Sequence, residues 1–376
     1  MWQRTTWLCV LLASAAWSHD AAGAAPKSVT PLELGVPAPD FALPGVDGKT
    51  YRLSDFAAAK LLVVVFTCNH CPTAQAYEDR LIQLHADFKD RGVALVAISP
   101  NDPLAVRLDE LGYTDLSDSF AEMKIRAKDR AFAFPYLYDG QTQATSLAFG
   151  VLATPHVFIF DAARKLRYQG RIDDSDVSVV KSHDTRNAIE ALLAGRPVPV
   201  ATTRVFGCST KWSDKRPSVG ESLAKWDAEA VAVQTIDEAG VRKLAQNDTK
   251  NLRLITVWAT WCIPCVEELP ELVTINRMYR KRKFEMITIS LDDPKERDTV
   301  LKRLQEKHVS STNYIFASEN RDKLAEALDL QWPGPVPYTI LVAPGGTVLY
   351  RKHDTIDAPA LKKAIVAHLG RTYASR

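Results

Sequence analysis

Two pairs of cysteines, each pair separated by two residues, are the groups in this chain best suited to chemistry. They read Cys262-Ile263-Pro264-Cys265 and Cys68-Asn69-His70-Cys71. Cysteines three residues apart in the first turn of a helix lie on one face, close enough to form a disulfide. Unpaired N–H groups and the positive end of the helix dipole favour ionisation of the leading thiol. Each pair could therefore cycle between dithiol and disulfide.

The residues around each pair predict the elements that position it. An apolar run precedes each pair, at residues 254–258 and 61–66, and suits a buried strand. Apolar residues at helical spacing follow each pair. Further strands and helices alternate along both halves of the chain. This pattern predicts an α/β fold with a mostly parallel sheet, covered on both faces and closed by a hairpin, in each half.

Both halves resemble thioredoxin-fold proteins. Residues 258–265 (WATWCIPC) resemble the active-site strand and turn of that superfamily, and residues 267–272 (EELPEL) resemble its TlpA/ResA-type branch. The first half resembles the peroxiredoxin-like redoxin group with Cys-Asn-His-Cys-Pro, over about residues 37–212, including GCSTKW at 207–212. The resemblance implies two tandem thioredoxin-like folds, each a central mixed β-sheet flanked by helices.

The chain is expected to divide into four parts. A charged start, an apolar core and a small-residue site predict a cleaved signal peptide at residues 1–24, which contains Cys9. The redoxin domain is expected at 31–196, a linker at 197–227 and the TlpA/ResA-like domain at 228–372. We therefore expect an exported protein, in a bacterial periplasm or an equivalent space, with no membrane span after signal cleavage.

The resemblance implies a thiol–disulfide oxidoreductase acting on protein dithiols and disulfides. Cys262 and Cys68 would attack, and Cys265 and Cys71 would resolve the mixed disulfide. Pro337 and Pro155 each precede an apolar strand and match the cis-proline that faces the disulfide in this superfamily. They would shape the surfaces on which a substrate's extended backbone docks.

Two residues are expected to tune these sites. Glu268 matches the glutamate of the ResA-like pattern and could relay protons to the second thiol, or it could be an exposed acid of the first helical turn. His70 could favour the thiolate and make the first site the more oxidising, or it could be an exposed spacer. Under the first reading of His70, electrons would run from the second pair to the first.

Two stretches of the first half remain open. Residues 101–132 are longer than a connection requires and are interpreted as an insertion that covers part of the site. Cys208 lies in GCSTKW, within the linker. It could be an extra redox or resolving thiol, or a small buried hydrophobic residue.

Several other functions are less well supported by the residues. A thiol-dependent peroxidase at Cys68, with the second domain as its reductant, would need a hydroxyl and a proline where Val65 and Leu61 stand. Zinc shared between the pairs, or a binding protein without turnover, are further alternatives. The net charge of +2 gives no indication of nucleic acid, and the basic cluster at 277–283 is interpreted as a solvated helix end. No organic cofactor or metal is implied, and the upstream thiol–disulfide donor or acceptor stays unidentified.

Overall fold

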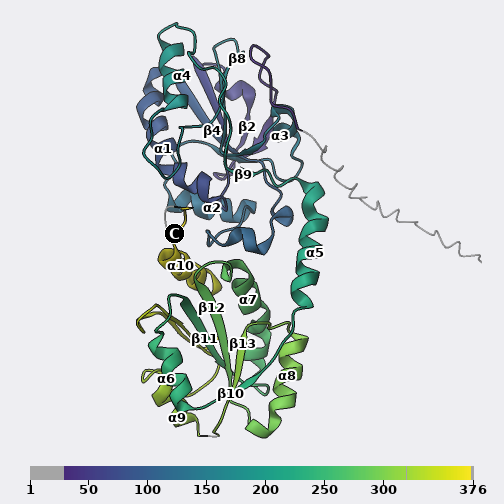
Figure 1. The fold of residues 1–376 in the computed structure, drawn as a ribbon. Coiled ribbons are helices and arrows are strands. Elements are labelled where there is room, and N and C mark those ends of the chain that lie inside the picture. Colours follow the sequence, from purple (N-terminus) through teal and green to yellow (C-terminus); the bar gives the residue numbers. More distant parts are fainter. Residues whose placement is uncertain (1–28, 319, 374–376) are drawn as a thin grey trace, which may run out of the picture.

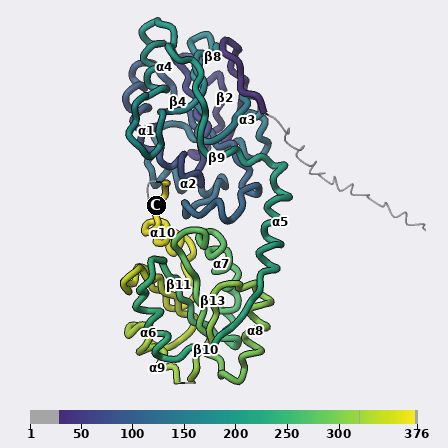
Figure 2. The backbone as a smooth tube through the Cα atoms, in the orientation of Figure 1, coloured from purple at the N-terminus to yellow at the C-terminus, as the bar shows by residue number. Residues whose placement is uncertain are grey.

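The chain forms two α/β units that lie end to end. The computed structural model describes residues 29–318 and 320–373, so the predicted signal peptide and Cys9 lie outside the described residues. Helix α5 (Arg216–Asp227) runs along one side and connects the units (Figures 1 and 2). Among the helices of the described residues, none is long and apolar enough to cross a membrane.

The first unit contains a mixed five-stranded sheet in the order β5-β4-β3-β7-β8. Strand β3 pairs in parallel with β4 and antiparallel with β7. The strands are β3 (Leu61–Phe66), β4 (Val93–Ser99), β5 (Tyr136–Tyr138), β7 (His156–Phe160) and β8 (Leu166–Gly170). The helices are α1 (Pro72–Phe88), α2 (Phe120–Asp129), α3 (Ala144–Phe149) and α4 (Asp184–Leu193), and β1 (Ala42–Pro44) and β2 (Thr50–Arg52) form a hairpin.

Strand β3 is the centre of this sheet because both of its faces are covered. All six of its residues are buried. Successive side chains of a strand point to opposite faces, and Val63 and Val65 accordingly enter the core that α1 and α4 cover, while Val64 enters the core that contains Phe149 of α3. The apolar run that predicted a buried strand therefore holds the first cysteine pair at the end of the sheet.

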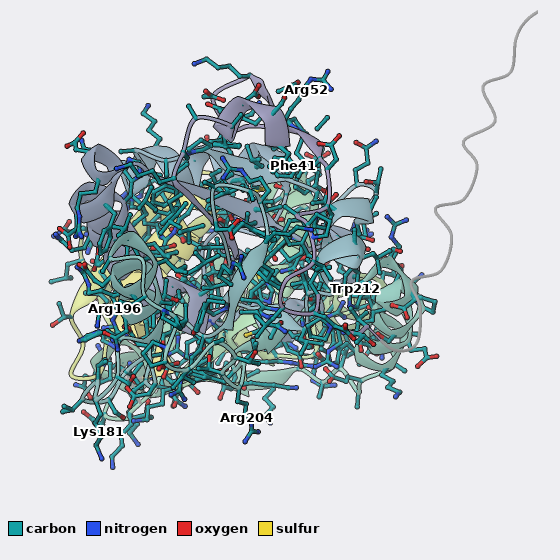
Figure 3. All side chains as sticks on the ribbon, turned by 90° about the horizontal axis from the view of Figure 1, so that it is seen from above. Phe41, Arg52, Lys181, Arg196, Arg204 and Trp212 are labelled. Carbon is teal, nitrogen blue, oxygen red and sulfur yellow. A yellow bond between two sulfur atoms is a disulfide. The ribbon has the colours of Figure 1, made fainter. Side chains whose placement is uncertain are left out.

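Several charged side chains lie on the surface of the first unit. Seen from above, the exposed side chains of Arg52, Lys181, Arg196 and Arg204 project outward from this unit (Figure 3).

The second unit contains a six-stranded sheet in the order β10-β13-β12-β11-β14-β15. Its strands are β10 (Gln234–Ile236), β11 (Leu252–Trp258), β12 (Phe284–Ser290), β13 (Thr312–Phe316), β14 (Tyr338–Val342) and β15 (Val348–His353). Its helices are α6 (Glu238–Gln246), α7 (Ile263–Tyr279), α8 (Arg297–Glu306), α9 (Arg321–Leu328) and α10 (Ala358–Leu369). Strand β11 is parallel to β12 and antiparallel to β14, so this sheet is also mixed. The predicted fold class is confirmed.

The first strand of the second unit differs from the prediction. The apolar run at residues 230–233 predicts a strand there, but β10 begins at Gln234. The pairing of β10 with β13 starts at Gln234 opposite Tyr314. Before that point the side-chain amide of Asn313, and not a neighbouring strand, donates to the carbonyl of Ala232 at 3.1 Å. The stretch predicted as a linker also contains regular elements, β9 (Cys208–Ser209) and helix α5.

The carboxyl end of α7 contacts the insertion of the first unit. Tyr279 donates its hydroxyl proton to the carbonyl of Thr114 at 2.8 Å. Arg371 pairs with both oxygens of Asp115, at 2.6 and 2.9 Å. The rings of Tyr113 and Tyr373 stack edge to face, with centroids 5.2 Å apart. The insertion therefore joins the two units.

The interpretation of the basic cluster at 277–283 as a solvated helix end is wrong for the buried Arg277, whereas Lys281 and Lys283 are exposed. Arg277 is buried and pairs with Asp227, and Arg280 pairs with Glu229. Lys281 pairs with Asp109 of the insertion. The acidic partners come from distant parts of the chain, which a local reading of charge does not include.

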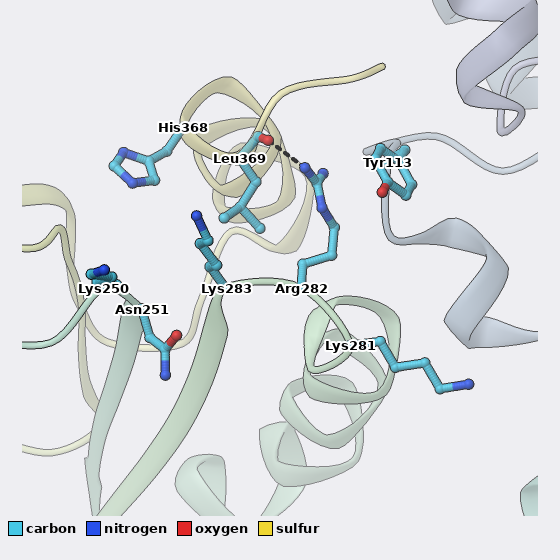
Figure 4. Close-up of a pocket in the computed structure, with 8 residues that line it drawn as sticks. All are labelled: Tyr113, Lys250, Asn251, Lys281, Arg282, Lys283, His368 and Leu369. Atoms are coloured by element: carbon cyan, nitrogen blue, oxygen red, sulfur yellow. Dashed lines mark hydrogen bonds between the residues drawn. The ribbon is translucent and has the colours of Figure 1, made fainter. Parts of the chain in front are cut away.

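A pocket of about 710 Å³ opens beside this cluster. Its lining side chains come from the ends of α7 and α10, the start of β11 and the insertion (Figure 4). Arg282 donates to the carbonyl of Leu369, as Figure 4 shows, and its guanidinium lies 3.9 Å from the centre of the Tyr113 ring.

Candidate active sites

The second cysteine pair lies at the junction between β11 and α7. Cys262 and Cys265 form a disulfide, with Cα atoms 5.3 Å apart. Cys262 is the residue that caps α7, and the N–H of Cys265 donates to its sulfur at 3.3 Å. Cys265 is fully buried, whereas 6% of Cys262 is exposed. The helix N-terminus therefore acts on the sulfur nearer the surface, as the motif predicted.

A cis-proline and two exposed apolar side chains lie beside this disulfide. Val257, at the end of β11, pairs with Tyr338, so Pro337 lies beside the strand end from which the cysteine turn departs. The Val336–Pro337 bond is cis, which confirms that expectation. The apolar side chains of Trp261 and Ile263 flank Cys262 and are 52% and 70% exposed. Exposed apolar groups of this size are typical of a contact surface.

Glu268 lies one turn along α7 and is buried, so the alternative of an exposed acid is wrong. Its Oε2 accepts a hydrogen bond from the N–H of Ile356 at 2.9 Å. Its Oε1 has no hydrogen-bond partner among the described residues. Burial raises the pKa of Glu268 to about 7, although the bond from Ile356 opposes this shift. A carboxyl group with such a pKa can exchange a proton near neutral pH. The proton-relay role remains a prediction.

The first cysteine pair is placed differently with respect to its helix. Helix α1 begins at Pro72, after both cysteines, and its capping residue is Cys71. The N–H of Ala74 donates to the sulfur of Cys71 at 3.4 Å. Cys68 and Cys71 are both free thiols and both buried. The helix N-terminus therefore favours a thiolate at Cys71, and not at Cys68 as the motif predicted.

Thr154 lies against both of these thiols. The Thr154–Pro155 bond is cis, which confirms the second expectation of this kind. The Oγ1 of Thr154 lies 3.1 Å from the sulfur of Cys68. The thiol of Cys71 donates to the carbonyl of Thr154 at 3.3 Å. The residue before the cis-proline thus contacts both sulfurs, although nothing in the motif had indicated Thr154.

His70 is buried and is not an exposed spacer. Its Nδ1 lies 2.5 Å from Oδ2 of Asp118, and the backbone N–H groups of Asn69 and His70 donate to Oδ1 of Asp118 at 2.9 and 3.0 Å. Burial lowers the pKa of His70, but the charge of Asp118 outweighs it and the net pKa is raised. Burial raises the pKa of Asp118, but His70 and these hydrogen bonds hold it below its usual range. The carboxylate of Asp118 therefore favours the protonated form of His70 close to the thiols.

Sequence reasoning missed Asp118. It lies in the insertion that was expected to cover the site, but nothing distinguished it from the other acids there. The side-chain amide of Asn101 also donates to its Oδ2 at 2.7 Å. The insertion both covers the first site and supplies its buried carboxylate.

Cys208 lies beside this pair. It packs against the cluster of Cys68, Cys71 and Ala74. Burial raises the pKa of Cys71, but the two neighbouring thiols, the charge of His70 and the N–H of Ala74 hold it well below its usual range. Burial raises the pKa of Cys68 well above its usual range. These surroundings favour ionisation of Cys71 over ionisation of Cys68.

The first site offers ligand atoms suited to a metal, but its carboxylate is already bonded. Ligand atoms of Cys68, His70 and Asp118 lie within 4.8 Å of one another. Both oxygens of Asp118 accept hydrogen bonds from buried donors, whereas the buried Nε2 of His70 has no hydrogen-bond partner among the described residues.

The two cysteine pairs do not face each other. Cys262 and Cys265 lie at the start of α7, whereas Tyr279 at its end contacts the insertion that covers the first site. A helix of 17 residues spans roughly 25 Å at 1.5 Å per residue. This separation excludes one zinc ion shared by both pairs. It also excludes the hypothesised direct transfer of electrons between the pairs in this arrangement.

The sequence model described as the AhpC/TSA family matches residues 34–169 and 206–351, which together are well over half of the chain. The chain belongs to the AhpC/TSA family. Each of the two matched regions contains one cysteine pair, in agreement with two tandem thioredoxin-like folds.

The chain is also similar to thiol–disulfide oxidoreductases. The thiol-disulfide oxidoreductase ResA of Oceanobacillus iheyensis is 25% identical over 130 residues, which are 35% of this chain and 62% of that protein. The chain thus spans about three fifths of the length of this curated relative.

Two solved structures are similar to parts of the chain. An uncharacterized conserved protein from Geobacillus kaustophilus is 38% identical and covers 48% of this chain and 93% of its own, with a TM-score of 0.43. A thiol:disulfide interchange protein of the thioredoxin family from Chlorobium tepidum TLS is 17% identical and covers 42% and 97%, with a TM-score of 0.32.

Proposed function

We propose that this protein is an exported thiol–disulfide oxidoreductase whose Cys262–Cys265 pair exchanges disulfides with protein substrates. One observation carries the proposal. This disulfide lies at a helix N-terminus beside a cis-proline, with Trp261 and Ile263 exposed on either side of Cys262. A protein substrate would lay an extended segment along Pro337 and bring its own sulfur to Cys262. The likeness to ResA supports this activity.

The exchange follows from the positions of the two sulfurs. In the reduced form the thiolate of Cys262, favoured by the helix N-terminus, attacks a substrate disulfide and forms a mixed disulfide. Cys265 then attacks Cys262 and releases the reduced substrate. Glu268 would accept the proton of Cys265, because its pKa near 7 suits transfer at neutral pH. The first pair would perform the same chemistry within its enclosed site, with a donor or acceptor that is not identified.

A peroxidase at Cys68 is less well supported. Cys68 is only 3% exposed, and burial raises the pKa of its thiol. A thiol with a raised pKa is rarely ionised at neutral pH, and only the thiolate attacks a peroxide readily. Export rests on the predicted signal peptide.

Replacing Cys265 by serine tests the proposal. The C265S variant keeps the attacking thiol but cannot resolve, so it should accumulate a mixed disulfide with a protein substrate such as insulin. The matched C262S variant should form none. If C262S and C265S trap the substrate equally, the roles assigned to the two cysteines are wrong. If neither variant traps it, the proposed disulfide exchange with proteins at this site is wrong.

A further inference from the structure

The segment that carries Cys208 occupies the edge on which a substrate of the first site would dock. Strand β9 pairs antiparallel with β6 (Ala153–Thr154), and Cys208 stands opposite Thr154, next to the cis-proline Pro155. Adding a strand to an exposed edge is a common way of binding a peptide. Here the chain fills that edge with its own backbone and brings a cysteine with it.

Gly207 allows this close approach. A Cβ atom at this position would lie 2.1 Å from the carbonyl oxygen of Thr154, and its φ of +142° is rarely adopted by other residues. After Cys208, the hydroxyl of Thr210 donates to the carbonyl of Val151 at 3.3 Å, and the N–H of Lys211 donates to Oδ1 of Asn101 at 2.9 Å. The segment is therefore held in place on both sides of the thiol.

Cys208 is the outermost of the three thiols. Cys68 and Cys71 are buried, whereas Cys208 is partly exposed. It lines a cavity of about 270 Å³ between the units, together with Tyr113, Lys211 and Tyr373. A thiol or disulfide that enters this cavity would meet Cys208 before either buried cysteine.

We propose that Cys208 is a third redox thiol, which attacks the Cys71 sulfur of a Cys68–Cys71 disulfide and forms a Cys71–Cys208 disulfide. This inference rests on the proposed thiol–disulfide chemistry of the first site. The bond between Cys71 and Cys208 forms as the bond between Cys68 and Cys71 breaks. The proton that Cys208 loses is taken up by Cys68, so no oxidant or reductant is consumed.

Two groups beside Cys68 can assist its departure in this step and oppose the effect of burial, which raises the pKa of its thiol. The hydroxyl of Thr154 lies 3.1 Å from its sulfur and can donate to the departing thiolate. The Nδ1 of His70 lies 3.6 Å from the same sulfur and adds positive charge nearby. Cys208 packs against the cluster that contains Cys68 and Cys71, and it stands opposite Thr154, which contacts both of their sulfurs. The exchange would carry the disulfide from the buried pair to the cavity.

Disulfide mapping of the C68S variant tests this inference. The full chain without its signal peptide is equilibrated with oxidised and reduced glutathione at a ratio that oxidises the wild-type pair, then alkylated and digested with trypsin without reduction. Trypsin leaves Cys68 and Cys71 in peptide 61–80 and Cys208 in peptide 205–211. The linked pair of these peptides should account for most of the C68S protein and less than about a tenth of the C71S protein.

The two proposals fail separately in this experiment. If C68S forms no link between these peptides, the role of Cys208 is overturned. If the wild-type protein also forms no disulfide within peptide 61–80, the proposed chemistry of the first site fails as well. The Cys262–Cys265 disulfide, in peptide 254–277, reports in every sample that the chain is folded and oxidised.

Discussion

Glu268 shows how burial of a single carboxyl group prepares it for proton transfer. Its pKa of about 7 lies above the value of 4.5 for a free glutamate. We expect E268Q to slow disulfide reduction through Cys262 and Cys265 by at least about tenfold, because the group that accepts the proton is lost. The pH dependence of the remaining rate should lose its inflection near pH 7. An unchanged inflection in E268Q would assign it to another group.

The same pKa predicts how stability depends on pH. A glutamate whose pKa is raised by folding binds its proton more tightly in the native state, so stability falls as the pH rises from about 4.5 to about 7. The loss is on the order of 3 kcal/mol at most. The free energy of unfolding of the second unit, measured by guanidinium denaturation, should be lower at pH 8 than at pH 5. The E268Q variant should not show this difference.

Asp118 is expected to be the main polar support of the first site. The D118A change leaves the buried His70 and the two backbone N–H groups without their acceptor, which should cost about 3–5 kcal/mol of stability. Asp79 is the matched control, because its side chain is 85% exposed in its pair with Arg130. The D79A change should cost less than about 1 kcal/mol. Equal costs in thermal or denaturant unfolding would contradict this role.

The pH dependence of this pair has two limits. The pKa of His70 is raised in the folded protein. Its contribution to stability is therefore complete below about pH 6.5 and is lost as the pH rises through the folded-state pKa. The pKa of Asp118 is lowered, so its contribution is complete above about pH 4 and is lost on acidification. The stability of the D118A variant should lack both of these changes with pH.

At the scale of elements, the pairing of β6 with β9 holds Cys208 against Cys71. We expect G207A to push the two strands apart, because its Cβ would overlap the carbonyl of Thr154. Cys208 should then react with iodoacetamide several times faster than in the wild type. Gly220, in α5, has open space around its Cβ position, so G220A should leave this rate unchanged. An unchanged rate in G207A would show that the pairing does not protect Cys208.

At the scale of the whole molecule, the second unit contacts the insertion that covers the first site. Tyr113 contacts Tyr373 and the guanidinium of Arg282, contacts that together contribute about 2 kcal/mol. We expect Y113A to raise the population of open arrangements, and the alkylation rate of Cys68 and Cys71, on the order of tenfold. The R303A change removes an exposed pair with Glu306 and serves as the control. Equal rates in both variants would show that the contact between the units does not limit access.

The sequence was most informative where the signal is local. Buried strands, cis-prolines and the helix start at Cys262 follow from apolar runs and a motif of a few residues. Asp118, Thr154 and the acidic partners of the basic cluster could not be found this way, because they meet their partners only after distant segments fold together. The hypothesised direct transfer of electrons from the second pair to the first could not be judged from the sequence for the same reason, since the length of α7 separates the two pairs.

Reduction of insulin disulfides by the reduced protein tests the central claim that protein substrates react at the second pair. We predict that C262S lowers the rate by at least about a hundredfold. We predict that C68S stays within about threefold of the wild type, because the first pair is enclosed. A C262S protein that retains the wild-type rate, or a C68S protein that loses it, would contradict this account.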